Sequence, residues 1–434
     1  MPDVVIIGGG PGASALGSYL SMAGVDNAIF EKANHPRPHV GESLVPSTSR
    51  IFNEIGFLET MEREGFVHKP GAAWHPSATS GLHKMVFADF PLEGVPQDYS
   101  YHVERSHFDS LLLKHAQSLG TKVHEGVAVK EVLFDDEGTA NGVRVAVAGQ
   151  TMDVPAKVVV DASGRNTLLG NQLGLKKRDP IFNQFAVHAW FADVDRGPED
   201  VEEYIHIYFL PLNRGWAWQI PTGDNVTSFG VVAEKSYFKE CGMNIEEWFD
   251  HMVSLNPDLS KALAGATCIR EHGAEADYSY TMEQFAGDGY ILIGDAARFV
   301  DPIFSSGISV AMHSAKYASD AIVAALDTGN FKRESWLEYE RQLKSGVDVW
   351  YEFILLYYKL LHLFTHFITH KEYKIEILRL LSGDVYERSE VKVLDAMRDM
   401  IHTVETTPNH LLAGKLGDIP IDFMASTPER SATG

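Results

Sequence analysis

The sequence predicts an α/β protein in three parts: a domain with a mostly parallel sheet, a smaller domain built on an antiparallel sheet, and a helical C-terminal region. Three observations lead to this prediction. A strand, a glycine-rich turn, a helix and a second strand open the chain, aromatic and β-branched residues alternate through its middle, and a helical pattern dominates after about residue 330. With 434 residues, the chain is long enough for two or three packed units.

Composition narrows the functional classes. The formal net charge of −22 opposes binding to nucleic acid or to an anionic membrane surface, because both need a local excess of Lys and Arg. The longest apolar stretch, residues 350–368, contains Glu352 and Lys359, so it is a poor candidate for a membrane span. Two cysteines without motif spacing, Cys241 and Cys268, favour a reducing cytoplasm over an oxidising compartment.

The opening of the chain carries the most specific signal. "DVVIIGG" predicts a buried strand, "SALGSYLSMAG" a helix closed by Gly24, and "NAIFEK" a second strand. Gly8, Gly10 and Ala13 have the spacing of a dinucleotide-binding turn, in which a pyrophosphate lies on the helix N-terminus. Glu31 ends the second strand, where a carboxylate can bind a ribose 2′-hydroxyl. The pattern predicts a dinucleotide site and leaves NAD and FAD as alternatives.

Three later segments extend this domain, which we place at residues 1–179 and 270–329. Residues 108–132 predict a helix and a strand, residues 156–165 a buried strand ending in a small-residue turn, and residues 288–322 a buried strand, a loop and a long helix. Asp295 follows the last strand, where it can bind a sugar-like hydroxyl or merely cap a helix. The long helix starts near Gly307 and offers free N–H groups to oxygens of a ligand.

Residues 180–269 predict the antiparallel sheet. "FNQFAVHAWFADV", "YIHIYFLPL", "GWAWQIPTG" and "VTSFGVVAEK" alternate and are rich in aromatic and β-branched residues. Trp216 and Trp218 are two residues apart, so on a strand they point to the same face. Two interpretations stay open at this point, a pair of core side chains and an aromatic wall of a reaction chamber.

The C-terminal region, residues 330–434, is predicted to be helical with a disordered tail, "MASTPERSATG". The stretch 350–368 predicts one amphipathic helix, and its apolar face comprises Phe353, Leu356, Tyr357, Leu360, Leu361 and Phe364. His362, His366 and His370 are four residues apart, a geometry that can bind metal. No fourth ligand is evident, so a structural or surface role is favoured and no metal is expected.

Three motifs together carry a resemblance to a known family. The Gly8–Ala13 turn with Glu31, "DASGR" and "GDAARFVDP" resemble the FAD-dependent monooxygenases with the para-hydroxybenzoate hydroxylase type of fold. "WAWQIP" matches the WxWxIP signature of flavin-dependent halogenases, and "HVGESLVP", "HKPGAAW" and "FSSGIS" match the branch that acts on phenols and pyrroles. Over nearly its whole length the chain is very similar to the pyrrolyl-carrier-protein halogenases, the group that serves pyoluteorin biosynthesis.

The resemblance implies a Rossmann-like FAD-binding domain and a cofactor site. The residues matched to that site are Gly8, Gly10, Pro11, Gly12, Ala13, Glu31, Lys32, Gly41, Ser43, Arg105, Val127, Asp161, Ala162, Asp295, Pro302, Gly307 and Ile308. It also implies that FADH2 and O2 form a C4a-hydroperoxide, which oxidises chloride or bromide to hypohalous acid. The sequence gives no preference between the two halides, because both fit the same donors.

The same resemblance assigns catalytic roles. Lys69 matches the lysine that relays hypohalous acid to the acceptor ring, and burial should lower the pKa of its amine. Ser306 and Gly307 match the residues whose amides hold the halide. Trp216 and Trp218 would keep the organic ring away from the flavin. Phe304 stands where tryptophan halogenases carry a glutamate, which disfavours free tryptophan as the substrate.

The implied partners are an acyl or peptidyl carrier protein bearing a pyrrole-2-carboxyl group and a separate flavin reductase, since no second glycine-rich nucleotide motif is present. The alternatives are a halogenase of a free phenol or another tethered aromatic, a flavin hydroxylase or oxidase, and a non-catalytic flavin- or prenyl-binding protein. The oligomeric state is open, with a homodimer as one alternative. We expect residues 330–410 to cover the substrate side, and Lys371, Lys374 and Arg379 to form a basic patch for an acidic carrier.

Overall fold

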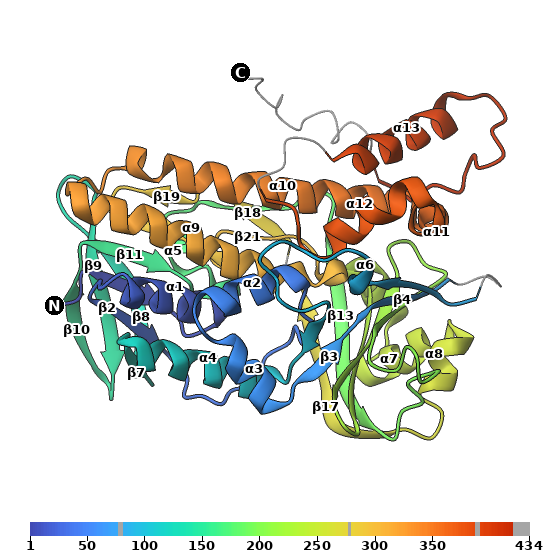
Figure 1. Cartoon of the computed structure of the whole chain (residues 1–434), viewed down its shortest axis with the longest axis horizontal. Coiled ribbons are helices and arrows are strands. Elements are labelled where there is room, and N and C mark those ends of the chain that lie inside the picture. The colour runs from blue at the N-terminus through green and yellow to red at the C-terminus, as the bar shows by residue number, and fades with distance from the viewer. Residues whose placement is uncertain (77–80, 277–278, 387–390, 420–434) are drawn as a thin grey trace.

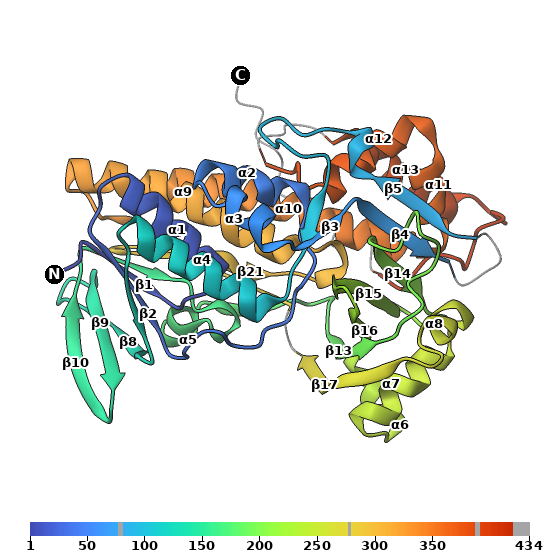
Figure 2. The same ribbon diagram turned by 60° about the horizontal axis from the view of Figure 1, so that its bottom comes forward.

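The structure is a computed structural model, and it describes residues 1–76, 81–276, 279–386 and 391–419 (Figure 1). The predicted disorder of residues 424–434 lies outside these ranges. The parallel sheet lies at one end of the molecule and the larger, mostly antiparallel sheet at the other (Figures 1 and 2). The C-terminal helices lie over the second sheet, on the side away from α6, α7 and α8 (Figure 2). The three predicted parts are therefore present, and the fold is α/β as predicted.

The parallel sheet follows from the opening pattern of the sequence. Its central strand β1 (Val4–Ile7) is buried and pairs in parallel with β2 (Asn27–Glu31) and β11 (Val158–Asp161). The order is β19-β20-β11-β1-β2-β7, completed by β7 (Lys122–Glu125), β20 (Tyr290–Leu292) and the antiparallel β19 (Ala286–Gly287). Parallel strands run in one direction, so the carboxyl ends of β1, β2 and β11 meet at one edge, where ligands bind in such sheets.

Helices and a small sheet cover the two faces of this parallel sheet. α1 (Pro11–Met22) packs against both α4 (Arg105–Leu119) and α9 (Ser306–Thr328). The small residues of α1 let its neighbours approach closely: a Cβ at Gly12 would lie 3.4 Å from Ala311 Cβ of α9, and a Cβ at Gly17 would lie 2.8 Å from Thr121 Oγ1, just after α4. The small sheet is antiparallel and comprises β8 (Ala128–Phe134), β9 (Ala140–Val147) and β10 (Gln150–Pro155), with β9 against β11.

The second large sheet has seven strands in the order β17-β13-β16-β15-β14-β4-β5. Five come from the region in which the sequence predicts a sheet: β13 (Gln184–Ala192), β14 (Ile205–Phe209), β15 (Trp216–Gly223), β16 (Val226–Glu234) and β17 (Thr267–Ala276). The other two, β4 (Gly71–His75) and β5 (His83–Val86), precede residue 180 and join through a parallel pairing of β4 with β14. The sheet therefore binds two distant parts of the chain together.

Strand alternation gives this sheet two different buried faces. The outer face, with Phe185, Tyr208 and Phe229, packs on α7 (Ile245–Ser254) and α8 (Pro257–Ala262), beside α6 (Lys235–Cys241). The inner face carries Trp216 and Trp218 and belongs to the main core. The two tryptophans share a face, as the spacing predicts, because side chains two apart on a strand point the same way.

The helical region after residue 330 corrects one prediction. Residues 350–368 do not form one helix: α10 (Leu337–Lys359) ends at Lys359, a single 3₁₀ turn follows over Leu361–Leu363, and α11 (Phe364–Thr369) starts afresh. The backbone carbonyl of Lys359 accepts a hydrogen bond from Gly417 N–H at 2.8 Å. The side-chain Nζ of Lys359 donates to Ile419 O at 2.8 Å and forms an ion pair with Glu405. A distant segment thus takes the carbonyl that a continuing helix would use. α12 (Lys371–Leu381) and α13 (Lys392–Thr406) complete the region.

Shorter elements connect these parts. α2 (Pro46–Glu54) and α3 (Leu58–Glu64) lead into β3 (Val67–Lys69), which pairs with β6 (Ser100–His102). A three-stranded sheet comprises β12 (Lys176–Arg178), β18 (Tyr280–Met282) and β21 (Arg298–Phe299), and α5 (Leu168–Gln172) follows β11.

Candidate active site

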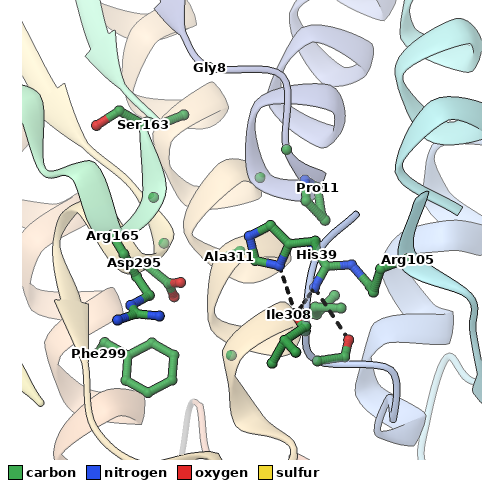
Figure 3. Close-up of a pocket in the computed structure, with 18 of the residues that line it drawn as sticks. Gly8, Pro11, His39, Arg105, Ser163, Arg165, Asp295, Phe299, Ile308 and Ala311 are labelled. Atoms are coloured by element: carbon green, nitrogen blue, oxygen red, sulfur yellow. Dashed lines mark hydrogen bonds between the residues drawn. The ribbon is translucent and has the colours of Figure 1, made fainter. Parts of the chain in front are cut away.

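A cavity of about 530 Å³ runs from the edge of the parallel sheet to the inner face of the antiparallel sheet. We call it the central cavity. It is lined by the Gly8–Gly12 turn, residues 37–43, the Ala162–Asn166 turn, the two tryptophans of β15 and the start of α9. In Figure 3, Gly8 and Pro11 lie at one side of the cavity, with His39, Arg105 and Ile308 near them, and Arg165, Asp295 and Phe299 lie opposite.

The glycine-rich turn has the close backbone approach that a dinucleotide requires. Gly8 has φ +101° and lies so near β11 that a Cβ there would be 2.6 Å from Ala162 O. A side chain at this position would therefore clash with the backbone as well as strain the turn. Gly10 is the N-cap of α1, and Pro11 opens the helix, so free N–H groups of the first turn face the cavity.

Glu31 fixes the turn from the end of β2. Its Oε2 accepts from Gly9 N–H at 2.6 Å and its Oε1 accepts from Ala33 N–H at 2.8 Å. The side chain is buried and lines the cavity beside Lys32. Each carboxylate oxygen keeps further lone pairs, so Glu31 can hold the turn and still accept from a ribose hydroxyl.

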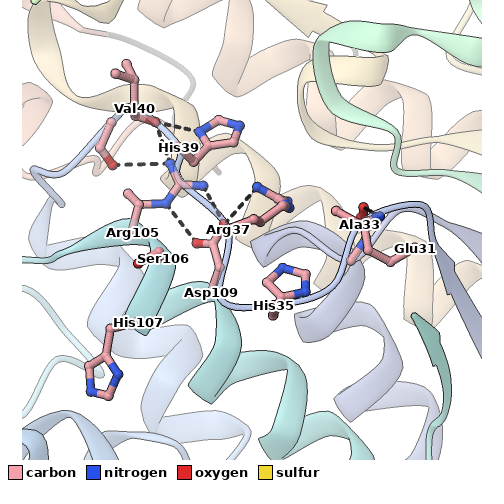
Figure 4. Close-up of polar contacts among 12 residues, drawn as sticks. Glu31, Ala33, His35, Arg37, His39, Val40, Arg105, Ser106, His107 and Asp109 are labelled. Atoms are coloured by element: carbon pink, nitrogen blue, oxygen red, sulfur yellow. Dashed lines mark hydrogen bonds and ion pairs between the residues drawn. The ribbon is translucent and has the colours of Figure 1, made fainter. Parts of the chain in front are cut away.

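Arg105 holds the wall formed by residues 37–43 (Figure 4). Its guanidinium donates to Val40 O at 2.7 Å and forms a two-pronged pair with Asp109 at 2.8 and 3.0 Å. Arg37 lies 3.7 Å from the same carboxylate. The nearby charge of Arg105 lowers the pKa of His39 to about 4, so His39 is neutral at pH 7. This wall presents cationic and neutral donors to the cavity, as an anionic phosphate ligand requires.

Asp295 faces the cavity from the opposite side. Burial raises the pKa of its carboxyl to about 6, while Arg165 and Arg105 lower it. Arg165 is itself fixed by a bond to Ala276 O at 2.8 Å and by a pair with Glu275. Asp295 is thus a carboxylate with cationic neighbours, suited to accept from hydroxyl groups of a ligand.

Trp216 and Trp218 close the far end of the central cavity. Their ring centroids are 5.8 Å apart, both are buried, and both line the cavity. Trp216 Nε1 donates to Tyr358 Oη at 2.9 Å, and Trp218 Nε1 donates to Ser228 Oγ at 3.2 Å. The pair is therefore part of the core and also lines the central cavity.

Lys69 lies on a strand that contacts β15, the strand of the tryptophan wall, but it does not line the central cavity. It ends β3, is only 3% exposed, and donates from Nζ to Leu44 O at 2.7 Å. Its Nζ also lies 5.5 Å from the centre of the Phe87 ring. Burial alone lowers the pKa of Lys69 to about 7, in the direction expected from the sequence. His68 points elsewhere and stacks on Tyr99 at 4.0 Å.

The turn before α9 lies at the cavity edge. Ser305 adopts φ +58° as N-cap, α9 begins at Ser306, and Gly307 and Ile308 line the cavity. Ser306 is buried but does not line it. Phe304 is also outside the cavity and stacks on Phe353 of α10, with ring centroids 4.4 Å apart. The turn therefore places backbone N–H groups on the cavity side and an aromatic ring against the C-terminal helices.

The central cavity collects most of the predicted site residues. Those that line it are Gly8, Gly10, Pro11, Gly12, Glu31, Lys32, Gly41, Ser43, Arg105, Ala162, Trp216, Trp218, Asp295, Pro302, Gly307 and Ile308. Those that do not are Ala13, Val127, Asp161, Ser306, Lys69 and Phe304.

Three of the residues that do not line the cavity support the elements that do. Ala13 is buried within α1, and Val127 N–H donates to Glu31 O at 2.9 Å. Asp161 is fully buried and accepts from Ser163 N–H at 2.9 Å and Leu169 N–H at 2.7 Å, so its carboxylate holds the turn that follows β11.

Several lining residues were not predicted individually. Among them are Gly9, Arg37, His39, Glu42, Arg165 and Phe299. His39 and Glu42 belong to "HVGESLVP", Arg165 to "DASGR" and Phe299 to "GDAARFVDP", so the motifs themselves were the available signal. A motif does not show which of its side chains faces the ligand, because that depends on the turn in three dimensions.

The donor set fits FAD. The Gly8 turn and the first turn of α1 suit a pyrophosphate, Glu31 suits a ribose, and the tryptophan wall at the other end suits a flat ring system. Among the described residues, no group of three or more His, Cys, Asp or Glu is placed to hold a metal ion. His366 and His370 are exposed neighbours with ring centroids 5.4 Å apart. Within the same described ranges, no helix is long and apolar enough to cross a membrane.

Comparison with known proteins agrees with this geometry. Residues 1–345 match the family described as "FAD binding domain". The 1H-pyrrole-2-carbonyl-[peptidyl-carrier protein] chlorinase of Pseudomonas fluorescens is 46% identical over 439 residues, covering 96% of this chain and 97% of that protein. The corresponding brominase of Pseudoalteromonas luteoviolacea is 32% identical, covering 92% of this chain and 96% of its own length.

A solved structure gives the same answer for the fold. The flavin-dependent brominase Bmp2 superposes with a TM-score of 0.84 at 30% identity, covering 93% of this chain and 99% of that chain. The relatives match along almost their whole length, so the likeness extends beyond the nucleotide-binding domain to the tryptophan wall and the C-terminal helices. The chain therefore belongs to the flavin-dependent halogenases, an enzyme family built on the FAD-binding domain.

Proposed function

We propose that this enzyme halogenates a pyrrole-2-carboxyl group held as a thioester on an acyl or peptidyl carrier protein, within natural-product biosynthesis. The observation that carries the proposal is the position of Lys69, which is buried on a strand that contacts β15 and lies outside the cavity that fits FAD. The names of the two relatives that cover most of this chain support the substrate class.

The residues divide the work between two compartments. Bound reduced flavin would use O2 to oxidise chloride or bromide to hypohalous acid in the central cavity. Backbone N–H groups at Ser306 and Gly307 are the proposed halide donors, because they open α9 and Gly307 faces the cavity. Trp216 and Trp218 exclude an organic ring from the flavin, so only a small molecule passes to Lys69.

Lys69 is the proposed relay. Its amine is fixed to Leu44 O, and its pKa of about 7 leaves a substantial neutral fraction at neutral pH. A neutral amine can take up the electrophilic halogen, and a protonated one can donate a hydrogen bond to hypohalous acid. Either form keeps the electrophile next to the acceptor ring. A pyrrole is electron-rich, so it needs no carboxylate beside it, consistent with Phe304 at the turn.

The packing of the C-terminal helices favours a tethered substrate over a free phenol. Phe304 contacts Phe353 and Tyr357 of α10 and Phe364 of α11, with ring centroids 4.4, 5.0 and 6.5 Å apart. These rings pack around Phe304, which does not line the central cavity. A long, thin carrier arm needs only a narrow entrance, whereas a free ring diffusing in needs an open pocket.

We also propose that a separate reductase supplies the reduced flavin and that the enzyme works in the cytoplasm. Both cysteines, Cys241 and Cys268, are unpaired, as a reducing compartment permits. The sequence holds no second glycine-rich nucleotide motif.

The test is the change Lys69→Ala. Purified enzyme, a flavin reductase, NADH, FAD, halide and a pyrrolyl carrier protein are incubated, and the intact carrier is weighed by mass spectrometry. Wild-type enzyme should add halogen masses, and the variant should lose product at least about a hundredfold, as removal of a catalytic group does. FAD binding and flavin reoxidation should stay at wild-type levels, because Lys69 does not line the central cavity.

Two results would contradict the proposal. Near wild-type halogenation by Lys69→Ala would remove the relay role. Efficient turnover of free pyrrole-2-carboxylate or of a free phenol, with an unchanged carrier mass, would replace the tethered substrate by a free one. A hydroxylated product in the presence of halide would favour a flavin hydroxylase instead.

A further inference from the structure

Asp301 is a buried carboxylate at the base of the turn that opens α9. It is 1% exposed and directly precedes a single 3₁₀ turn over Pro302–Phe304. Its Oδ1 accepts a hydrogen bond from Ile303 N–H at 2.9 Å, so the side chain caps this turn. The turn leads into Ser306 and Gly307, the proposed halide donors. Asp301 therefore fixes the backbone that presents those N–H groups.

Tyr358 of α10 connects the same carboxylate to the tryptophan wall. Its Oη lies 3.2 Å from each carboxylate oxygen of Asp301 and 2.9 Å from Trp216 Nε1. An indole N–H can only donate, so the phenol oxygen accepts from Trp216 and its own proton is left to donate to Asp301. The direction of both hydrogen bonds is thus fixed, from indole to phenol and from phenol to carboxylate.

Tyr358 is held in place by segments that are distant in the sequence. A Cβ at Gly417 would lie 2.2 Å from the backbone oxygen of Tyr358, so the chain passes very close to it there. Arg214, two residues before Trp216, donates to Asp418 O at 2.6 Å. A phenol held in this way can transmit a change at the carboxylate to the indole, because it cannot simply move away.

Both ends of this hydrogen-bond chain reach the central cavity. Trp216 lines the cavity at one end, and Pro302 of the capped turn and Gly307 of α9 line it at the other. Asp301 itself does not line the cavity. It therefore acts on a bound ligand only through the turn that it caps and the indole that Tyr358 holds.

We propose that Asp301 is a positioning residue: one carboxylate holds the turn of the proposed halide donors and, through Tyr358, the indole of Trp216. The inference rests on the proposed function, since it takes Ser306 and Gly307 to bind halide. It adds that two walls of the cavity are set together by a side chain that does not line it.

The ionisation of Asp301 makes this arrangement sensitive to pH. Burial raises the pKa of its carboxyl to about 7, while the hydrogen bonds from Ile303 and Tyr358 lower it. An ionised carboxylate accepts the phenol proton more strongly than a neutral carboxyl, and it thereby makes the phenol oxygen a better acceptor for the indole. The titratable and charged groups that face Asp301 are Tyr357 and Tyr358 of α10, Arg214 before β15, and Asp179.

The test follows the indole N–H of Trp216 by NMR. FAD-loaded, full-length enzyme with ¹⁵N-labelled tryptophan is titrated from pH 5.5 to pH 9, and the Trp216 signal is identified by its loss in Trp216→Phe. Asp301→Asn keeps an acceptor oxygen but cannot ionise, and Tyr358→Phe keeps the ring but removes the link. Tyr357→Phe is the matched control, because the Tyr357 hydroxyl forms no hydrogen bond to any described residue.

In wild type and in Tyr357→Phe, the Trp216 signal should shift with a midpoint near pH 7. In Asp301→Asn and in Tyr358→Phe this titration should disappear. A side chain that served only packing would change stability without removing a titration from a distant indole, so the signal separates the two roles.

Halide binding tests the other end of the chain. In halogenation of a pyrrolyl carrier protein, Asp301→Ala should raise the KM for halide about three- to tenfold, as expected for the loss of one hydrogen bond at the turn. Asp301→Asn should restore most of this loss, because its amide oxygen can still accept from Ile303 N–H.

A Trp216 titration of wild-type amplitude in Asp301→Asn or in Tyr358→Phe would overturn the inference, as would no titration in wild type. An unchanged KM for halide in Asp301→Ala would overturn the role of the carboxylate at the turn. Absence of halogenated product with wild type would refute the proposed function. The NMR titration needs no turnover, so it decides the hydrogen-bond chain separately.

Discussion

The buried position of Lys69 disfavours the charged form of its amine. Its amine is buried with one backbone acceptor, Leu44 O, and an aromatic ring, Phe87, as neighbours. Burial alone lowers its pKa to about 7. An exposed lysine would be a fully protonated, hydrated cation at neutral pH, and its amine would have no free lone pair with which to react. The environment therefore changes an ordinary surface residue type into a group that exchanges protons near neutral pH.

This lowered pKa predicts a pH dependence of stability. In the unfolded chain a lysine keeps a pKa of about 10.4, so between pH 7 and 10 the unfolded state binds more protons than the folded state. The free energy of unfolding should therefore rise with pH across this window, by at most about 1.4 kcal/mol per pH unit. Below about pH 7 both states are protonated, and the cost of the buried charge is fully present.

The measurement compares wild type with Lys69→Met by urea unfolding from pH 7 to pH 10. Wild type should gain stability relative to the variant as the pH rises. Lys114→Met, which removes an exposed lysine of α4, is the control and should run parallel to wild type. Parallel curves for Lys69→Met as well would show that Lys69 carries no buried charge.

At the scale of an element, β15 and β16 set the position of the tryptophan wall. Trp218 and Gly230 are cross-strand partners, and a Cβ at Gly230 would lie 2.1 Å from Cζ2 of the Trp218 indole. The absence of a side chain on β16 therefore makes the room in which the indole lies flat. The neighbouring hydroxyl of Ser228 fixes the same ring through Nε1.

Gly230→Ala should displace Trp218. We expect a loss of stability of about 1–3 kcal/mol from overpacking and weaker FAD binding, because Trp218 lines the central cavity. Urea unfolding and a fluorescence titration with FAD measure the two effects. Gly223→Ala is the control on β15, since its nearest neighbour to a new Cβ is Val226 at 3.9 Å. Equal behaviour of the two variants would mean that the indole tolerates a shift without consequence for the cavity.

At the scale of the whole molecule, the C-terminal helices pack against the main core beside the second sheet (Figure 2). Their aromatic side chains pack on Phe304 and Trp74, so this region is part of the main core. The expected basic patch is largely neutralised there. Lys374 pairs with Asp89 at 2.6 Å, and Arg379 pairs with Glu376 and lies over the Phe90 ring. Lys371 stays exposed, with no ion pair to any described residue.

Lys371 is therefore the remaining cation of that patch with which to test carrier docking. Lys371→Glu should raise the KM for a pyrrolyl carrier protein by about three- to tenfold at low salt, because carriers are acidic and this chain carries a net charge of −22. The effect should shrink as salt is added. Lys114→Glu changes the charge equally on α4 and should leave KM unchanged. Equal KM values for both variants would place docking elsewhere.

The sequence by itself determined the features that depend on near neighbours. The strand, turn and helix around Gly8 form as predicted because the glycine spacing and the apolar run act within a few residues. Trp216 and Trp218 share a face because strand periodicity is a local property. The family motifs also predicted many of the residues that line the central cavity, although they did not single out Arg37, Glu42 or Phe299.

Only the tertiary structure decided which of these features meet. The break of the helix at Lys359 depends on Gly417, whose N–H takes the Lys359 carbonyl. The addition of β4 and β5 to the second sheet depends on pairing between residues more than a hundred positions apart, such as Ala72 and Ile205. The hydrogen bond of Asp161 to the Leu169 N–H, which holds a loop, and that of Lys69 to Leu44 O likewise depend on contacts that only the folded chain brings together. Hydrogen bonds and packing between distant segments carry no periodic signature along the chain, so their partners are fixed only when the whole core forms.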